Sequence, residues 1–190
     1  MNAIFGLAAQ ALLVAWFVSR FTASMPYRQS RLFAAGAAAL SLIPLADGIS
    51  AAMALRALWG DPSITTLQLL ALSLAGRPAG IGRAPAAAFA LFGIAFYLLS
   101  LGDFGLGDWG LGDFDPYRLG YAAWPLTTAL GAAALFAWWR GQPIYLWLLA
   151  VDLAVFATGL PESTNLWDAL FDPLLVLAAL IAAARSLRRA

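Results

Sequence analysis

Seven apolar runs, separated by charged residues or by glycine and proline, dominate this sequence. They predict helices over residues 2–19, 32–55, 62–76, 84–101, 116–139, 143–160 and 165–185. A helix that crosses the hydrocarbon core of a bilayer needs about 20 residues. Segments 62–76 and 165–185 are the weakest candidates for full spans, because the first is short and an Asp-Pro pair interrupts the second.

The composition favours lipid as the solvent for these runs. The 190 residues are 63% hydrophobic and only 11% charged, whereas a soluble domain carries roughly 25% charged residues. A water-soluble fold of this size could not bury so much apolar surface. We therefore expect an all-α fold, namely a polytopic helix bundle in which residues 1–190 form a single transmembrane domain within the lipid bilayer.

The charged residues predict how the chain is oriented. If the N-terminus is outside and the helices alternate, nine of the eleven Arg lie inside, and only Arg56 and Arg118 lie outside. The inside segments contain no Asp or Glu, and eight of the ten acidic residues lie outside. Basic loops stay on the cytoplasmic side. This pattern predicts an outside N-terminus and a cytoplasmic C-terminus. Heavy use of Ala, Gly and Arg without Lys suggests a bacterial source, and we therefore expect the chain in the inner membrane of a bacterial cell.

Missing residue types exclude several chemistries. The chain has no Cys, His or Lys. Ordinary haem ligation, iron–sulfur clusters and zinc sites built on His or Cys are therefore excluded, as is a retinal Schiff base. The sequence also lacks a P-loop, a nucleophile elbow and a dinucleotide fingerprint. It predicts no cofactor, no metal and no nucleic-acid partner, and it favours a protein that is not an enzyme.

A five-residue repeat of the form LGD(F/W)G occupies residues 101–115. Dense glycine disfavours regular structure. The aromatic residues can rest at the headgroup level while the Asp residues face water. The repeat predicts an interfacial loop on the outer side. The alternative is a docking loop for other membrane or periplasmic proteins.

Three Asp-Pro pairs stand at the predicted outer starts of helices: Asp61-Pro62, Asp115-Pro116 and Asp172-Pro173. Asp accepts hydrogen bonds from the free N–H groups of a helix start, and Pro suits the first helical position. The carboxylate also complements the helix dipole. These three acids are predicted to be helix caps.

Two acids fall inside predicted helices. Asp152 lies near the middle of 143–160, and Asp47 lies in the outer half of 32–55. Charges at such depth are costly and usually face a bundle interior or a water cavity. They predict a proton or cation site, or a pair with Arg56 or Arg118. The alternative is a neutral Asp that hydrogen-bonds between helices, which is favoured for Asp47 because Pro44 predicts a kinked helix end.

An outer-face polar cluster is the other candidate site. Its members are Glu162, Asn165, Asp168, Arg56 and Arg118. If residues 165–172 are helical, Asn165, Asp168 and Asp172 share one face. Two nearby carboxylates raise the pKa of one of them, which suits acid–base work or cation binding. The alternative is an amphipathic interfacial helix.

Tryptophans near helix ends predict an interfacial belt. Gly36, Gly93 and Gly131 predict close helix packing. From these patterns we favour a non-catalytic membrane subunit or assembly factor that engages partners through its outer loops. The alternatives are a small transporter or proton/cation pathway that uses Asp152 and Asp47, and a membrane enzyme that uses outer-face carboxylates.

Overall fold

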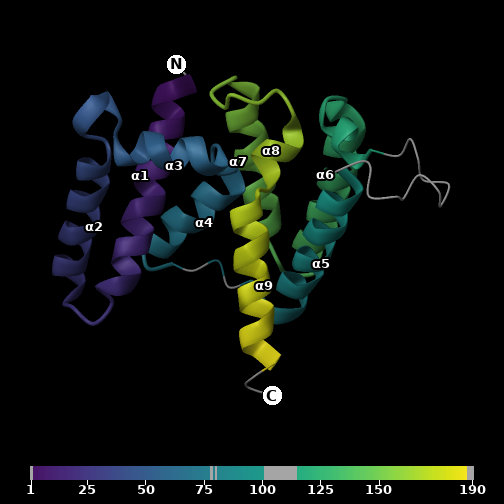
Figure 1. Ribbon diagram of the computed structural model, residues 1–190. Helices are drawn as coiled ribbons and strands as arrows, with labels where there is room; N and C mark the ends of the chain where they lie inside the picture. The colour runs from purple at the N-terminus through teal and green to yellow at the C-terminus, as the bar shows by residue number, and fades with distance from the viewer. Residues whose placement is uncertain (1, 78, 80, 101–114, 188–190) are drawn as a thin grey trace. The chain divides into compact units, whose positions relative to one another are not determined.

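The structure is a computed structural model that describes residues 2–77, 79, 81–100 and 115–187 (Figure 1). These residues form helices and no β-strand, which confirms the all-α expectation. The nine α-helices of the described part are α1 Asn2–Phe21, α2 Tyr27–Ser41, α3 Ala51–Trp59, α4 Ile64–Leu74, α5 Arg83–Ser100, α6 Ala123–Trp139, α7 Ile144–Ala157, α8 Leu166–Leu170 and α9 Pro173–Leu187. Two 3-10 helices join them, η1 Ala46–Gly48 and η3 Pro116–Gly120.

The chain divides into two compact units. The first unit contains Met1–Ala79 and Ala154–Glu162, and the second contains Gly80–Leu153 and Ser163–Ala190. Helix α7 begins in the second unit and ends in the first. The repeat predicted to be an outer loop falls on 101–114, outside the described residues.

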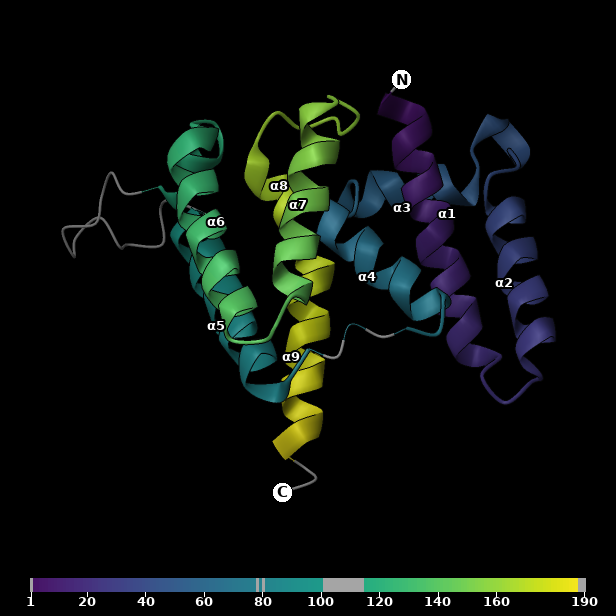
Figure 2. The ribbon, with the colours of Figure 1, turned by 180° about the vertical axis from the view of Figure 1, so that it is seen from behind.

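In the first unit, α1 packs against α2, α3 and α4. Helices α1 and α2 run side by side in opposite directions (Figures 1 and 2). The buried face of α1 contains small residues such as Ala11 and Ala15, which allow neighbouring helices to approach closely. The Oγ1 of Thr22 lies 2.8 Å from the Oγ of Ser30, and this hydrogen bond closes the turn between α1 and α2.

The single helix predicted over 32–55 is wrong. Helix α2 ends at Ser41, and α3 begins only at Ala51. Between them, Pro44 lacks the N–H that a continuing helix needs. Asp47 and Gly48 then take left-handed backbone conformations, with φ values of 63° and 74°. The proline therefore belongs to a complete break in the helix, and sequence reasoning treated that break as a kink.

In the second unit, α5 packs along α9. A Cβ added at Gly93 of α5 would overlap the side chain of Val176 on α9, so only glycine allows this approach. The packing prediction is confirmed for Gly93. It is wrong for Gly36 and Gly131, where an added Cβ would meet no described atom within 4 Å.

Aromatic side chains fill the interior of the second unit. Phe96 of α5 lies 4.9 Å from Trp167 and 4.7 Å from Phe171, measured between ring centroids. The rings meet at tilted or edge-on angles, the arrangements that aromatic quadrupoles favour. Trp167 is buried here, unlike the exposed Trp124 and Trp139 at the ends of α6.

The helix predicted over 165–185 is two helices. Phe171 ends α8 in an extended conformation, with a φ of −155° and a ψ of 158°. Helix α9 then begins at Pro173. Burial of the Phe171 ring in the aromatic interior accompanies this break, and tertiary packing of that kind cannot be read from a continuous apolar run.

Among the described residues, two helices are long and apolar enough to cross a membrane, Ala3–Phe21 and Arg83–Ser100. Length and composition alone also allow a buried core helix or, near the N-terminus, a signal sequence. The same part of the chain contains the shorter apolar helices Ile64–Leu74, Ile144–Ala157 and Pro173–Arg185.

Charged residues are sorted by helix end within each unit. In the first unit, four arginines lie where α1 ends, α2 begins and α4 ends: Arg20, Arg28, Arg31 and Arg77. The opposite helix ends carry Asp47, Arg56, Asp61 and Glu162. In the second unit, the basic helix ends carry Arg83, Arg140 and Arg185, and the opposite ends carry Asp115, Arg118, Asp168 and Asp172. Each unit therefore has a basic and an acidic end.

Candidate functional site

An ionic cluster, here called the Arg56 clamp, lies at the acidic end of the first unit and consists of Arg56, Asp61 and Glu162. Arg56 stands in the last turn of α3, and Asp61 follows in the connection to α4. The Arg56 guanidinium donates Nε to Asp61 Oδ1 at 2.6 Å and Nη2 to Asp61 Oδ2 at 2.9 Å. The same Nη2 donates to Glu162 Oε2 at 2.5 Å. The clamp therefore ties the segment after α7 to the α3–α4 connection.

The geometry of the Arg56 clamp is a paired, charge-assisted contact. Its hydrogen bond to Asp61 is the main reason that the pKa of Arg56 is raised above its ordinary value, against a smaller opposing effect of burial. One guanidinium faces two carboxylates, so the three side chains together carry a net charge of −1. Arg56 was one of two arginines that the sequence placed on the acidic side, and this pairing accounts for its position.

Helix α1 packs closely against the Arg56 clamp. A Cβ added at Gly6 would overlap Arg56 Nε and Asp61 Oδ1, so glycine makes room for the ion pair. One helical turn later, buried Gln10 donates Nε2 to the carbonyl of Gly60 at 2.8 Å. The Nε1 of Trp59 donates to Gln10 Oε1 at 3.3 Å. Gln10 therefore anchors the α3–α4 connection to α1.

The prediction that Asp61 caps a helix is wrong. Ser63 is the N-cap of α4, and its Oγ accepts from the N–H of Thr66 at 3.1 Å. Asp61 instead forms two charge-assisted hydrogen bonds with Arg56, and the cap of α4 is left to the neutral hydroxyl of Ser63. The cap prediction is confirmed for Asp172, which accepts from the N–H of Leu175 at 2.7 Å at the start of α9. Asp115 accepts from the N–H of Tyr117 at 2.9 Å, but it caps η3. The single helix predicted over 116–139 is wrong, since α6 begins only at Ala123.

A second cluster, here called the Asn165 staple, lies at the acidic end of the second unit. It consists of Asn165, Trp167 and the backbone of Pro116 and Tyr117 in η3. Asn165 is completely buried; its Nδ2 donates to the carbonyl of Tyr117 at 3.0 Å, and its Oδ1 accepts from the N–H of Trp167 at 2.9 Å. Trp167 donates Nε1 to the carbonyl of Pro116 at 2.9 Å. Two of these hydrogen bonds join η3 to α8, and the third caps α8.

Asp168 lies beside the staple but is exposed. Its Oδ2 accepts from Tyr117 Oη at 2.8 Å and from Ser163 Oγ at 2.5 Å. Burial, and then this hydrogen bond to Asp168, raise the pKa of the Tyr117 hydroxyl above its ordinary value. The expectation that Asn165, Asp168 and Asp172 share one helical face is wrong, because α8 ends at Leu170.

The predicted outer-face cluster is thus divided by the fold. Arg56 and Glu162 meet in the first unit, and Asn165 and Asp168 lie close together in the second. Arg118 is exposed on η3 of the second unit. Whether any of these residues acts on a ligand stays a prediction.

The two acids expected inside membrane helices differ. Asp152 is buried in α7, with 2% of its surface exposed. Asp47 is exposed in η1, so its predicted place inside a helix is wrong. In the described residues, no group of three or more acids could hold a metal ion.

Sequence reasoning missed Gly6, Gln10 and Tyr117. Gln10 carried a usable signal, since it is the polar residue within the apolar run from Ala3 to Val18. A lone amide in such a run predicts a buried hydrogen bond. Gly6 and Tyr117 gave no local signal, because their partners are distant in sequence.

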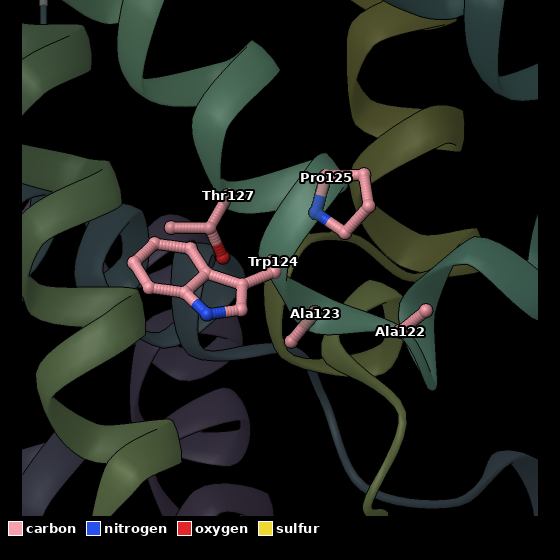
Figure 3. A pocket seen from close by; sticks show the side chains of 5 residues that line it. All are labelled: Ala122, Ala123, Trp124, Pro125 and Thr127. Atoms are coloured by element: carbon pink, nitrogen blue, oxygen red, sulfur yellow. The ribbon is translucent and has the colours of Figure 1, made fainter.

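An open surface hollow lies at the start of α6, lined by Ala122, Ala123, Trp124, Pro125 and Thr127 (Figure 3). The Trp124 indole lies beside Thr127, while Pro125 points away from it (Figure 3). Trp124 is 81% exposed. The described residues that line this hollow come from a single segment, and none of them is ionisable.

Comparison of the chain with known protein families, curated proteins and solved structures finds no match. Its function must therefore be inferred from its own residues.

Proposed function

We propose that this chain is a seven-span integral membrane protein of the bacterial inner membrane that serves as a non-catalytic subunit or assembly factor. Its N-terminus lies outside and its C-terminus in the cytoplasm. The proposed spans are α1, α2, α4, α5, α6, α7 and α9. The short helices α3 and α8 are proposed to lie at the outer surface.

The sorted charges at the helix ends carry this proposal. When the chain alternates across the bilayer, every basic helix end of both units falls on the cytoplasmic side, as short Arg-rich loops require. Within the seven proposed spans, Asp152 is the one charged residue away from a helix end. Apart from Arg56 and Arg118, which lie among the acids of the outer ends, basic and acidic residues are thus separated by apolar helix, which is typical of a membrane domain.

Exposed apolar side chains between those ends support the same proposal. Large hydrophobic residues are exposed on several spans, among them Leu40 on α2, Leu91 on α5, Leu135 on α6 and Leu177 on α9. Exposed tryptophans stand near both ends of α6, Trp124 at its start and Trp139 at its end. Lipid chains would cover the leucines, and the headgroup region would hold the indoles.

The role of the outer carboxylates favours a subunit over an enzyme. Asp61 and Glu162 bind Arg56. Asp115 and Asp172 cap helices, and Asp168 accepts two hydroxyl hydrogen bonds. Each of these acids already has a structural task, which supports a scaffold whose partners bind at its outer face.

Cysteine labelling tests the topology, because the natural chain has no cysteine. Thr164→Cys places a thiol on an exposed residue of the proposed outer side, and Gln142→Cys places one on an exposed residue of the proposed inner side. A membrane-impermeant maleimide should label the first variant in intact cells and the second only after permeabilisation. The reverse pattern overturns the orientation, and release of the chain by carbonate overturns membrane integration.

Co-purification tests the subunit role. The full chain is extracted gently from native membranes, and the proteins that accompany it are identified by mass spectrometry. A true partner should be retained by the natural chain and lost when one LGD(F/W)G unit of residues 101–115 is deleted. A chain that purifies alone overturns the subunit role.

The burial of Asp152 favours a second candidate, a proton or cation pathway. The residue lies in the ninth position of α7, at the middle of an apolar helix. Purified chain in liposomes that contain a pH-sensitive dye tests this candidate. A pathway requires proton flux that Asp152→Asn abolishes and Asp168→Asn leaves intact. Equal fluxes in protein-free liposomes exclude it.

A further inference from the structure

The basic end of the first unit carries four arginines and no acid among its described residues. Arg20 ends α1, Arg28 and Arg31 begin α2, and Arg77 follows α4. The Oγ of Ser73, near the end of α4, accepts from Arg20 Nη2 at 3.2 Å, which brings the α4 end beside α1. This concentration of positive charge is not neutralised by carboxylates within the described part of the unit.

Aromatic rings hold two of these guanidinium groups in place. Arg20 lies over the Trp16 ring at 5.3 Å, and Arg31 lies over the Tyr27 ring at 4.7 Å. Trp16 itself donates Nε1 to Ser73 Oγ at 3.1 Å. A guanidinium that stacks on a ring keeps its edge N–H groups available for other acceptors. The guanidinium groups of Arg20 and Arg31 are therefore preorganised to bind an anion.

The start of α2 adds to the attraction for an anion. Its N-cap is Pro26, which makes no side-chain cap hydrogen bond. The first N–H groups of this 15-residue helix are therefore available, and the helix dipole is positive there. Arg28 stands in the same first turn.

Exposed apolar side chains lie directly beside the arginines. Phe17 and Phe21 precede and follow Arg20 on α1, with ring centroids 4.7 Å apart. Leu32 and Phe33 follow Arg31 on α2, and both are exposed. A partner for this surface must offer an anionic group next to a long apolar one. A phospholipid has that shape, whereas a nucleic acid or an acidic peptide does not.

We propose that the α1–α2 end of the first unit, formed by Arg20, Arg28 and Arg31, binds an anionic phospholipid of the cytoplasmic leaflet. The lipid phosphate contacts the guanidinium groups and the N-terminus of α2. The acyl chains lie along the exposed phenyl and leucine side chains of α1 and α2. The leaflet assignment rests on the proposed function.

Lipid retention by the purified full chain tests the proposal. The chain in detergent is titrated with phosphatidylglycerol or with phosphatidylcholine, and bound lipid is counted by native mass spectrometry. The natural chain should prefer phosphatidylglycerol. Because an Arg near an anionic surface contributes about fivefold to binding, Arg28→Gln with Arg31→Gln should weaken retention by about 25-fold. Replacement of both by Lys should preserve most of it.

Arg140→Gln is the matched control, since Arg140 is exposed at a basic helix end of the second unit. It should change retention by less than about twofold. Equal retention of the two lipids, equal losses in the control and double variants, or displacement by inorganic phosphate would overturn the lipid site. Thermal unfolding of each variant in detergent confirms that it is folded.

A labelling experiment separates this proposal from the proposed orientation. Ser24→Cys places a thiol in the exposed turn between α1 and α2. Labelling of that thiol in intact cells overturns the orientation and the cytoplasmic leaflet. The arginine dependence of lipid retention in detergent still decides whether the site itself exists.

Discussion

The Arg56 clamp and the Asn165 staple both fix a connecting segment at an acidic helix end, but they use different chemistry. In the clamp, the charged side chains of Arg56 and Asp61 remain 22% and 18% exposed. In the staple, a neutral amide is completely buried. Solvent screens a partly exposed ion pair, whereas a buried amide that loses its partners leaves unsatisfied groups behind. We therefore expect the staple to contribute more to stability than the clamp.

The largest loss of stability is expected from Gly120→Ala, and a smaller loss from Gly6→Ala. In Gly120→Ala the new Cβ would overlap Asn165 Oδ1 and crowd Trp167, both buried. Overpacking of this kind costs about 1–3 kcal/mol in the free energy of unfolding. In Gly6→Ala the new Cβ meets the flexible ends of Arg56 and Asp61, which can move. Unfolding by SDS titration in mixed micelles measures both variants.

Gly131→Ala is the control for these two substitutions. Gly131 lies within α6, and an added Cβ there meets no described atom within 4 Å. Alanine should raise stability by up to about 1 kcal/mol through helix propensity alone. Equal losses in Gly120→Ala and Gly6→Ala would contradict the ranking of the two clusters.

The next effect is expected from Asn165→Ala. The change removes two hydrogen bonds and leaves the Tyr117 carbonyl and the Trp167 N–H without their partner. A buried group left unsatisfied costs about 1–3 kcal/mol. Thr164→Ala, at the exposed neighbouring position, should change stability by less than about 0.5 kcal/mol. The same SDS titration compares the two variants. An Asn165→Ala variant as stable as the natural chain would show that water replaces the lost hydrogen bonds of Asn165.

Local signals in the sequence predicted the helices and part of the capping. Apolar runs gave α1, α5 and α7 nearly as observed. Asp115 and Asp172 act as caps because the cap contact lies two or three residues away along the chain. Such short-range contacts depend on neighbouring residues, which a sequence displays directly.

Long-range contacts decided the rest. By residue type, either Asp61 or Ser63 could cap α4. Ser63 is the cap because Asp61 pairs with Arg56, which also donates to Glu162. Phe171 leaves the helical conformation where its ring enters an interior formed by α5. The contacts within such clusters cannot be read from the sequence, because the partners are far apart along the chain: Arg56 and Glu162 are separated by 106 positions.

The pH dependence of stability tests the Tyr117 hydroxyl, which belongs to a residue of the Asn165 staple. The pKa of Tyr117 is raised above its ordinary value of 10.0, so above about pH 10 the unfolded chain loses this proton while the folded chain keeps it. Fewer protons are bound in the unfolded state, and stability falls as pH rises further. Tyr117→Phe should remove part of that fall.

Thermal unfolding in detergent between neutral pH and about pH 11 measures this effect. The natural chain should be more stable than Tyr117→Phe at neutral pH, because the hydroxyl donates to Asp168 at 2.8 Å. The difference should narrow with rising pH. Tyr27→Phe, at an exposed residue, serves as the control. Parallel curves for the natural chain and Tyr117→Phe would rule out this role for the hydroxyl.

The smallest effect is expected at the exposed edge of the Arg56 clamp. Glu162 is 70% exposed in its side chain, and its contact with Arg56 is the outer of the two ion pairs. Exposed pairs contribute about 0–1 kcal/mol, and about 1 M salt shortens the screening length to roughly 3 Å. Glu162→Gln should therefore lower stability slightly at low salt and not at all at high salt. Asp61→Asn, which breaks the less exposed bidentate pair, should retain a loss at high salt. A loss in Glu162→Gln that salt leaves unchanged would mean that Glu162 holds the segment after α7 by packing and not by charge.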